Sequence, residues 1–389
     1  MTTEPKVAIV RCQSYEPTEV AAALAKGLEL IGGVNAIISP NEKVLLKVNA
    51  LLEAEPNATI TTHPTIVEAL AKLLKQKNYE VFIGDSPGNP VSNIDHLMTI
   101  TGFKAAAENS GTKILNFHQL PTREVKSPSN NRAIDSLRLS SAAFDYSIIS
   151  MAKLKTHGWT LYTGAIKNLF GLIPGFHKSQ YHLKAPQPYP FSQMLVDILE
   201  IAKPKLNIID AVYGMEGAGP SAGKKRFMGA ILLSTDPVAI DAIGAQAIGY
   251  KPFDIDMIKI AHERGLGCGK IEEIEIVGLG LQDITKPDWK HASSTHNITR
   301  LIPSGLGFLL APLKRFLRVN PVIDQAKCKK CQICVKSCPA KTIDYKNGRV
   351  EINLRNCIMC YCCHELCPYK AIKLKGSPLA KLMGFEPAA

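Results

Sequence analysis

Short apolar runs alternate with longer amphipathic stretches over roughly the first 290 residues. Apolar runs of strand length lie at residues 6–11, 43–48, 79–85, 146–151, 206–210, 230–234 and 273–277. Helical periodicity appears between them at residues 17–31, 64–77, 237–248 and 254–264. Strands joined by helices run parallel and are buried on both faces, so the pattern predicts an α/β fold with a mostly parallel sheet covered by helices.

Polar and small residues gather directly after several of these strands. Ligands of such sheets bind at the carboxyl ends of the strands, so these loops are candidate binding segments. They comprise residues 85–89, 153–157, 163–168 and 214–220, together with Asn49 and residues 61–64.

The region from residue 153 to 168 holds the strongest candidates for chemistry. Lys153, Lys155, His157, Lys167 and Asn168 lie there beside glycines that allow a close approach of the backbone. Cationic side chains bind carboxylate or phosphate, and a histidine or a lysine of lowered pKa can deliver a proton. His177 and His182 are candidates to join this site. The alternative is that the lysines are solvated and His157 caps a loop.

Two nucleotide-binding patterns fail on inspection. Residues 218–225 approach a P-loop but lack its first glycine and the Ser or Thr after Lys224. No G-x-G-x-x-G follows a strand, so a Rossmann site is unsupported. Four aspartates are candidate cation ligands: Asp85, Asp210, Asp236 and Asp241. Asp236 precedes a proline, however, and is more readily interpreted as the N-cap of a helix.

Two cysteine runs with C-x2-C-x2-C-x3-C-P spacing lie near the C-terminus. In two-cluster bacterial ferredoxins the fourth cysteine of each run ligates the other cluster. By that spacing, cluster I takes Cys328, Cys331, Cys334 and Cys367. Cluster II takes Cys357, Cys360, Cys363 and Cys338. The runs therefore predict two [4Fe–4S] clusters in a C-terminal α+β ferredoxin-type dicluster domain, with one three-iron cluster as the main variant.

Other uses of these cysteines fit less well. A zinc ribbon needs two pairs rather than two runs of four, and a disulfide framework needs an oxidising compartment. Cys362 breaks the spacing and is interpreted as a spectator, while Cys12 and Cys268 are expected to be buried side chains. A flavin or a further metal has no obligatory short motif, so the sequence leaves both open.

The net charge of +12 is concentrated at the C-terminal end. Residues 311–376 hold 14 Lys and Arg against 4 Asp and Glu, which leaves only +2 for the rest. A basic shell steers an acidic electron carrier such as ferredoxin or flavodoxin toward the clusters. No nucleic-acid-binding motif accompanies the charge. No apolar stretch resembles a signal or a membrane span, so a cytoplasmic location is expected.

Five motifs resemble the DUF362 family, a poorly characterised prokaryotic family that often carries a ferredoxin module. They are GDSPG, KLKTH, TGAIKNLFG, MEGAGPSAG and STDPVAIDAIGA. The resemblance implies a DUF362-like α/β domain at 1–295, a linker at 296–322, a ferredoxin-like domain at 323–376 and a tail at 377–389. The linker is partly amphipathic and basic, which predicts either packing against its own domain or a peripheral membrane contact.

Two functions remain after these exclusions. The first is a reductase that would pass electrons from a carrier through both clusters to a small anionic substrate or a second cofactor in the α/β domain. Alternatively, the chain transfers electrons to a partner protein and reduces that partner's metal centre. A binding module with purely structural clusters is disfavoured, because two clusters form a relay that such a role does not need.

Overall fold

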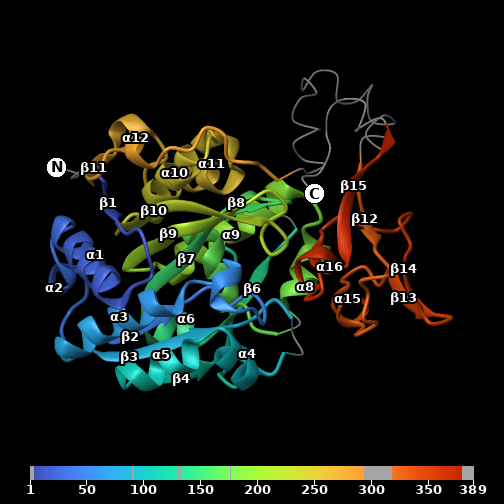
Figure 1. Ribbon diagram of the computed structural model, residues 1–389, viewed down its shortest axis with the longest axis horizontal. Coiled ribbons are helices and arrows are strands. Elements are labelled where there is room, and N and C mark those ends of the chain that lie inside the picture. Colours follow the sequence, from blue (N-terminus) through green and yellow to red (C-terminus); the bar gives the residue numbers. More distant parts are fainter. Residues whose placement is uncertain are drawn as a thin grey trace.

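The computed structural model describes residues 4–89, 92–129, 131, 133–175, 177–292 and 318–378. A large α/β part extends to residue 292, and a smaller cysteine-rich part begins at residue 318 (Figure 1). The predicted basic amphipathic segment of the linker and residues 379–389 of the predicted tail lie outside the described residues. Within the described ranges, no helix has the length and apolarity to cross a membrane.

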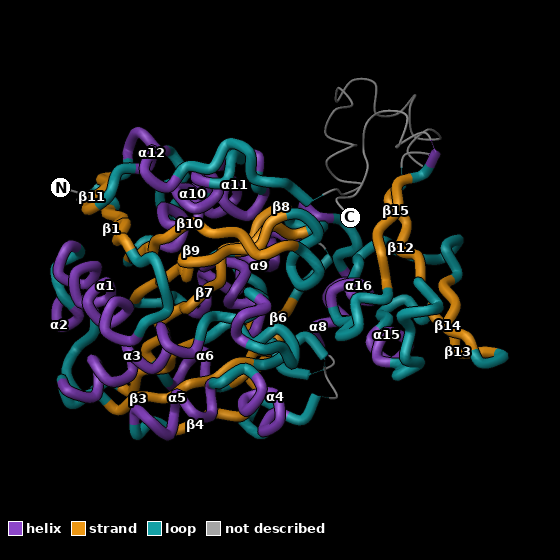
Figure 2. Tube along the Cα trace, viewed as in Figure 1, coloured by secondary structure: helices purple, strands orange, loops and turns teal. Residues whose placement is uncertain are grey.

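Nine strands of the described chain form one sheet, which runs through the large part (Figure 2). Their order is β11 (Glu275–Gly278), β1 (Lys6–Arg11), β10 (Lys224–Ser234), β9 (Leu206–Glu216), β7 (Ser147–His157), β2 (Lys43–Lys47), β3 (Glu80–Asp85) and β4 (Lys113–Asn116), with β8 (Leu161–Thr163) beside β7. Strand β10 is antiparallel to both neighbours and β8 is antiparallel to β7; the other pairs are parallel. The predicted mostly parallel sheet is confirmed.

Helices cover both faces of the sheet and create two apolar cores. Helices α1 (Pro17–Leu30), α3 (Pro64–Gln76), α4 (Ile94–Ile100) and α5 (Phe103–Ser110) belong to one core. Helices α9 (Pro188–Ala202), α10 (Pro237–Ala247) and α11 (Asp256–Glu263) belong to the other. Strand β2 shows the alternation that this requires, because Val44 and Leu46 enter the first core and Leu45 the second.

Shorter elements complete the large part. They are α2 (Val34–Ile37), β5 (Thr122–Lys126), β6 (Ser136–Ser140), α6 (Ala142–Asp145), α7 (Ala165–Asn168), α8 (His177–Lys184), α12 (Leu281–Ile284) and four 3-10 turns at Pro56–Ala58, Leu169–Leu172, Pro252–Asp254 and Ile271–Glu273.

Strand β7 is longer than its apolar run predicts. The sequence placed Lys153, Lys155 and His157 in a loop after residue 151, but the structure keeps them in the strand. The strand continues because β9 pairs with it through Lys153 and β8 pairs with it through Lys155. Lys153, Lys155 and His157 can be buried in this strand because each forms hydrogen bonds with neighbouring segments.

The same correction applies to the predicted loop at residues 214–220. Its first three residues belong to β9, which forms a long antiparallel ribbon with β10. The P-loop-like segment therefore connects two antiparallel strands, whereas a P-loop connects a strand to a helix.

The cysteine-rich part consists of two small sheets and two short helices. Its elements are β12 (Val319–Ile323), α15 (Ile333–Ser337), β13 (Ile343–Lys346), β14 (Arg349–Ile352), α16 (Cys362–Glu365) and β15 (Ile372–Gly376). Strand β12 begins inside the range predicted as linker and pairs with β15. Tyr361, Cys362 and Leu374 join the same apolar core as α9 and α10, so this part packs directly on the large part. In Figure 1, α16 lies beside α8, and the β13–β14 hairpin lies at the far end.

Candidate functional site

A cavity of about 90 Å³ lies where the two parts of the chain meet. Its walls come from the carboxyl ends of β2, β3 and β7, from α7 and α8, and from the cysteine-rich part. We call it the interface cavity. Four of the five candidate residues named from the sequence line it: Lys155, His157, Lys167 and Asn168. It therefore occupies the sheet edge at which open α/β folds bind ligands.

The fifth candidate, Lys153, lies apart from the cavity in a closed polar network. Its Nζ donates to Asp210 Oδ2 at 2.9 Å and to the Tyr15 hydroxyl at 2.7 Å. The Tyr15 hydroxyl donates to Asp210 Oδ1, and the His63 backbone N–H donates to Oδ2. Because these buried groups satisfy one another, the network ties β7 to β9 and to the chain after β1.

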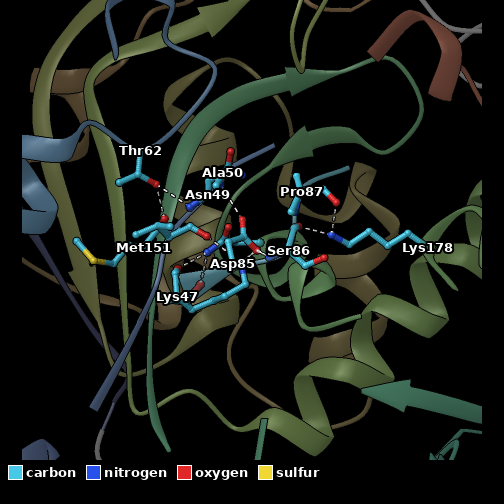
Figure 3. A network of polar contacts seen from close by, with 12 residues as sticks. Lys47, Asn49, Ala50, Thr62, Asp85, Ser86, Pro87, Met151 and Lys178 are labelled. Carbon is cyan, nitrogen blue, oxygen red and sulfur yellow. Dashed lines mark hydrogen bonds and ion pairs between the residues drawn. The ribbon is translucent and has the colours of Figure 1, made fainter. Parts of the chain in front are cut away.

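Asp85, which lines the cavity, belongs to a buried ion pair (Figure 3). Lys47 Nζ lies 2.6 Å from Asp85 Oδ1, and the Ala50 N–H donates to Asp85 Oδ2 at 2.7 Å. A Cβ on Gly171 would lie 2.0 Å from Asp85 Oδ1 and 2.5 Å from Lys47 Nζ. Only glycine therefore leaves room for this ion pair.

Two lysines of the cavity wall are held by oxygen acceptors. Lys155 Nζ donates to Asn49 Oδ1 at 3.2 Å and to the Ile60 carbonyl at 2.6 Å. Lys178 Nζ donates to the Ser86 carbonyl and, at 2.9 Å, to the Pro87 carbonyl (Figure 3). An ammonium group has three N–H donors, so each of these lysines keeps one for a ligand.

The third lysine, Lys167, is held differently. Its Nζ lies over the rings of Phe170 and Phe191, 5.4 and 5.8 Å from their centroids. Among the described residues, it contacts no hydrogen-bond acceptor and no carboxylate. Lys167 is therefore the cavity cation that is most available to an anion.

Burial sets the protonation of these groups. It lowers the pKa of Lys155 to about 7, with the charges of Lys167 and Lys153 acting in the same direction. Burial also lowers the pKa of Lys178 to about 7, although Asp85 opposes the shift. The pKa of Lys167 is lowered by burial too, against the attraction of Glu365. A bound anion would stabilise the charged form of all three.

His157 presents a fixed N–H donor to the cavity. Its Nδ1 accepts the backbone N–H groups of Trp159 and Thr160 at 3.0 and 3.3 Å, so the ring proton belongs on Nε2. Burial and the charge of Lys167 lower the pKa of His157 well below its usual value, which keeps the ring neutral. His157 is therefore a donor at neutral pH rather than a source of a second proton.

The other two histidines differ in position. His182 lines the cavity and stacks on Trp159 and Phe191, with ring centroids 4.8 and 4.5 Å away. His177 does not line it and contacts Gln180 near the surface.

Six buried polar atoms of the cavity-lining residues have no hydrogen-bond partner in the described part of the chain. They are Thr163 Oγ1, Asn168 Oδ1, His157 Nε2, His182 Nδ1, Ser337 Oγ and Glu365 Oε1. An unpartnered buried polar group costs about 1–3 kcal/mol, so this concentration indicates that water or a ligand completes the site.

The four aspartates do not form a cation site. Asp85 and Asp210 pair with lysines, and Asp236 caps α10 by accepting the Val238 and Ala239 N–H groups, as predicted. Asp241 accepts two backbone N–H groups at the start of α7. Across the described ranges, no three His, Cys, Asp or Glu side chains converge as the ligands of a single metal ion would.

The cysteines of the cluster I set surround a cavity, an arrangement that suits a cluster rather than a single metal ion. Cys328, Cys331, Cys334 and Cys367 line one cavity with apolar walls from Ile323, Ile333 and Val350. This is the set that the spacing predicts for cluster I, and it fits a cubane held by one thiolate per iron. For the other set, burial raises the pKa of Cys363 well above its usual value, and the thiols of Cys360, Cys357, Cys334 and Cys338 act in the same direction, so Cys363 lies near its predicted partners and near one cysteine of the first set.

Cys362 has a position that its sequence did not indicate. It is buried, lines the interface cavity and lies between two predicted ligands of cluster II. Ser337, which precedes the predicted ligand Cys338, lines the cavity as well. Both residues, each adjacent in sequence to a predicted cluster II ligand, thus line the same cavity as Lys155 and Lys167.

Sequence reasoning missed Lys47, Lys178 and Glu365. Lys47 was visible as a lysine inside an apolar strand, a position that requires a buried partner. Glu365 was visible as an acid between two cluster cysteines in a basic segment. Lys178 carried no comparable signal, because α8 is polar on most of its surface.

Comparison with known proteins matches both parts of the chain. Residues 44–246 match the family described as "Domain of unknown function (DUF362)", and residues 320–368 match a "4Fe-4S dicluster domain". The "Thylakoid-associated protein sll1697" of Synechocystis sp. is 31% identical over 266 residues, which cover 67% of this chain and 79% of that relative. The predicted family resemblance is confirmed, and the dicluster domain implies the two predicted [4Fe–4S] clusters.

Proposed function

Because the chain belongs to the DUF362 family and ends in a 4Fe–4S dicluster domain, we propose that it is a reductase acting on a small molecule in the interface cavity. When bound, the two clusters supply one electron each. The coarser role, electron transfer, follows from the dicluster domain itself.

One observation carries the proposal. The cavity that holds Lys155, His157 and Lys167 is closed on its other side by Cys362 and Ser337. Each of these two residues adjoins a proposed ligand of cluster II. A molecule in the cavity would therefore contact the polypeptide that wraps this cluster, which is the placement that short-range electron delivery needs.

The opposite end of the cysteine-rich part suits an incoming carrier. Cys331 of the cluster I set is exposed, whereas Cys360 and Cys363 of the cluster II set are buried. Three exposed lysines adjoin proposed cluster I ligands in the sequence, and a fourth follows Cys367 after two residues: Lys327, Lys329, Lys330 and Lys370. Positive charge attracts acidic proteins, so we propose that a ferredoxin or flavodoxin docks at this end.

The cavity lysines are the proposed proton source. The pKa of Lys155 and that of Lys178 are both about 7, so each is partly protonated at neutral pH. An acid with a pKa near the working pH is well matched to proton transfer. His157 instead orients the substrate through its Nε2–H.

The test is reoxidation of the anaerobically reduced protein by small oxo- and unsaturated carboxylates. Recovery of cluster absorbance in the native protein, at least about tenfold slower in Lys155→Met, supports the reductase. Lys251→Met is the control, because Lys251 is exposed and does not line the cavity. If only a protein with its own metal centre reoxidises the clusters, the chain is an electron-transfer or activation protein.

For location, we propose the cytoplasm with a peripheral membrane contact. The Synechocystis relative is named for an association with thylakoids. The basic balance of residues 311–376 suits an anionic membrane surface. Sedimentation of the protein with anionic but not neutral vesicles tests this contact.

A further inference from the structure

The unpartnered atoms of the interface cavity include both hydrogen-bond donors and hydrogen-bond acceptors, so a ligand that satisfies them must itself carry both acceptors and a donor. We propose that the cavity binds a small hydroxycarboxylate anion. The inference rests on the proposed function for the reaction in which this anion takes part, but the binding itself requires no electron transfer.

Cationic and neutral donors specify the carboxylate. Lys167 has no acceptor among the described residues, and Lys155 and Lys178 each keep one N–H. His157 adds its Nε2–H, and Thr163 adds a buried hydroxyl. A carboxylate offers about four acceptor positions, which these donors can fill.

Two acceptors specify a donor on the same ligand. The amide of Asn168 is oriented by its Nδ2, which donates to the Lys47 carbonyl and Ser150 Oγ, so Oδ1 is left without a partner. Glu365 Oε1 is the second unpartnered acceptor; it lies 3.3 Å from His157 Nε2 without a hydrogen bond between them. Fully ionised sulfate or a simple carboxylate brings only oxygens without hydrogen, so it would leave both atoms unsatisfied.

The donor on the ligand is a hydroxyl rather than an ammonium. Lys155, Lys167 and Lys178 line the same small space together with two acids, Asp85 and Glu365. Asp85 is already paired with Lys47, so the lysine charges outnumber the remaining acid and disfavour a second cation. A hydroxyl is neutral and both donates and accepts. It can therefore meet Asn168 Oδ1 or Glu365 Oε1 while accepting from Ser337 Oγ.

Size and wall composition limit the rest of the molecule. The volume of about 90 Å³ is well below the roughly 300 Å³ at which pockets for drug-sized ligands begin, which favours a ligand of few heavy atoms. Leu51, Phe170 and Leu366 contribute apolar wall. A short aliphatic chain beside the carboxylate and hydroxyl matches this lining.

The experiment is calorimetric titration of the oxidised, cluster-containing protein with lactate, acetate, alanine and inorganic phosphate. Lactate should bind at least about tenfold more tightly than acetate, which lacks one hydrogen-bonding group, and more tightly than alanine. Lys167→Gln should weaken lactate binding about 10- to 100-fold, and Thr163→Val about tenfold. Lys251→Gln, on the exposed surface, should leave it unchanged.

Cluster absorbance reports that each variant is folded. Equal affinities for lactate and acetate, tighter binding of phosphate or alanine, or Lys167→Gln and Thr163→Val variants that bind lactate as the native protein does would overturn the assignment. Because this titration measures binding rather than reoxidation of the clusters, its failure and that of the reoxidation test are distinguishable.

Discussion

Nε2 of His157 lies 3.3 Å from Oε1 of Glu365, where the end of β7 faces the short helix α16. Neither atom has a hydrogen-bond partner in the described chain, so the contact lacks hydrogen-bond alignment and both atoms remain available. Ser221 Oγ fixes the approach by donating to the Glu365 carbonyl at 2.7 Å. The candidate site is thus completed only when the two parts of the chain pack together.

Substitution of the cysteines around α16 tests the proposed ligand sets. Cys362→Ser should retain about eight irons, because Cys362 interrupts the ligand spacing. Cys363→Ser should lose cluster II or convert it to a three-iron form. Iron analysis and electron paramagnetic resonance of the reduced protein measure both. Loss of four irons in Cys362→Ser, with a normal content in Cys363→Ser, would reverse the assignment.

Anion binding should weaken as the pH rises above about 7. Burial lowers the pKa of Lys155 to about 7, so its charge is present below that pH and is lost above it. A bound carboxylate raises this pKa again, which displaces the decline toward higher pH. Calorimetric titration with lactate from pH 6 to 9 measures the effect. In Lys155→Met the slope should be shallower; an unchanged slope would show that Lys155 does not titrate with binding.

The same shift has a consequence for stability. The pKa of Lys155 is lower in the folded protein than its usual value, so the unfolded chain binds more protons between about pH 7 and the usual value. Lys155 therefore opposes folding most below pH 7, and its contribution improves as the pH rises. Any excess in the free energy of unfolding of Lys155→Met over that of the native protein should therefore shrink, or change sign, as the pH rises from 6 to 9. Urea denaturation across that range checks it.

The buried ion pair of Lys47 and Asp85 should be essential to the fold. Asp85→Ala leaves the Lys47 charge buried without its partner and should lower the free energy of unfolding by about 3–5 kcal/mol. Lys26→Ala is the matched control. It breaks an ion pair with Glu29 whose side chains are 55% and 70% exposed, and it should cost less than about 1 kcal/mol. Similar losses in both variants would show that burial does not strengthen the Lys47–Asp85 interaction.

Much of the architecture could be predicted from the chain because its signals are local. The apolar run at residues 6–11 is β1, and the Pro-initiated helix at 64–77 is α3 apart from its last residue. The cysteine spacing fixes which sulfurs can meet, and the structure places the cluster I set around one cavity. Strand β7 exceeded its prediction because pairing with β8 and β9, not apolarity, keeps residues 152–157 extended.

The composition of the site could be predicted only in part, because its other half comes from distant segments. Lys155 and Lys167 could be identified because they lie in a short segment with other polar residues and glycines. Lys178 and Glu365 line the cavity only because α8 and α16 pack beside that segment in the folded chain. Lys153 shares the sequence pattern of Lys155 but meets Asp210, which lies opposite it on the adjacent strand. Register therefore decides which lysine is structural and which faces the cavity.

A redox titration that resolves both clusters tests most directly whether the interface cavity adjoins cluster II. Lys167 lines the interface cavity, and Lys329 lines the cavity of the cluster I cysteines. Loss of a nearby positive charge disfavours an added electron. Lys167→Gln should shift one cluster to a more negative potential by on the order of tens of millivolts. Lys329→Gln should shift the other. If both variants shift the same cluster, or Lys167→Gln shifts neither, the cavity is not coupled to cluster II.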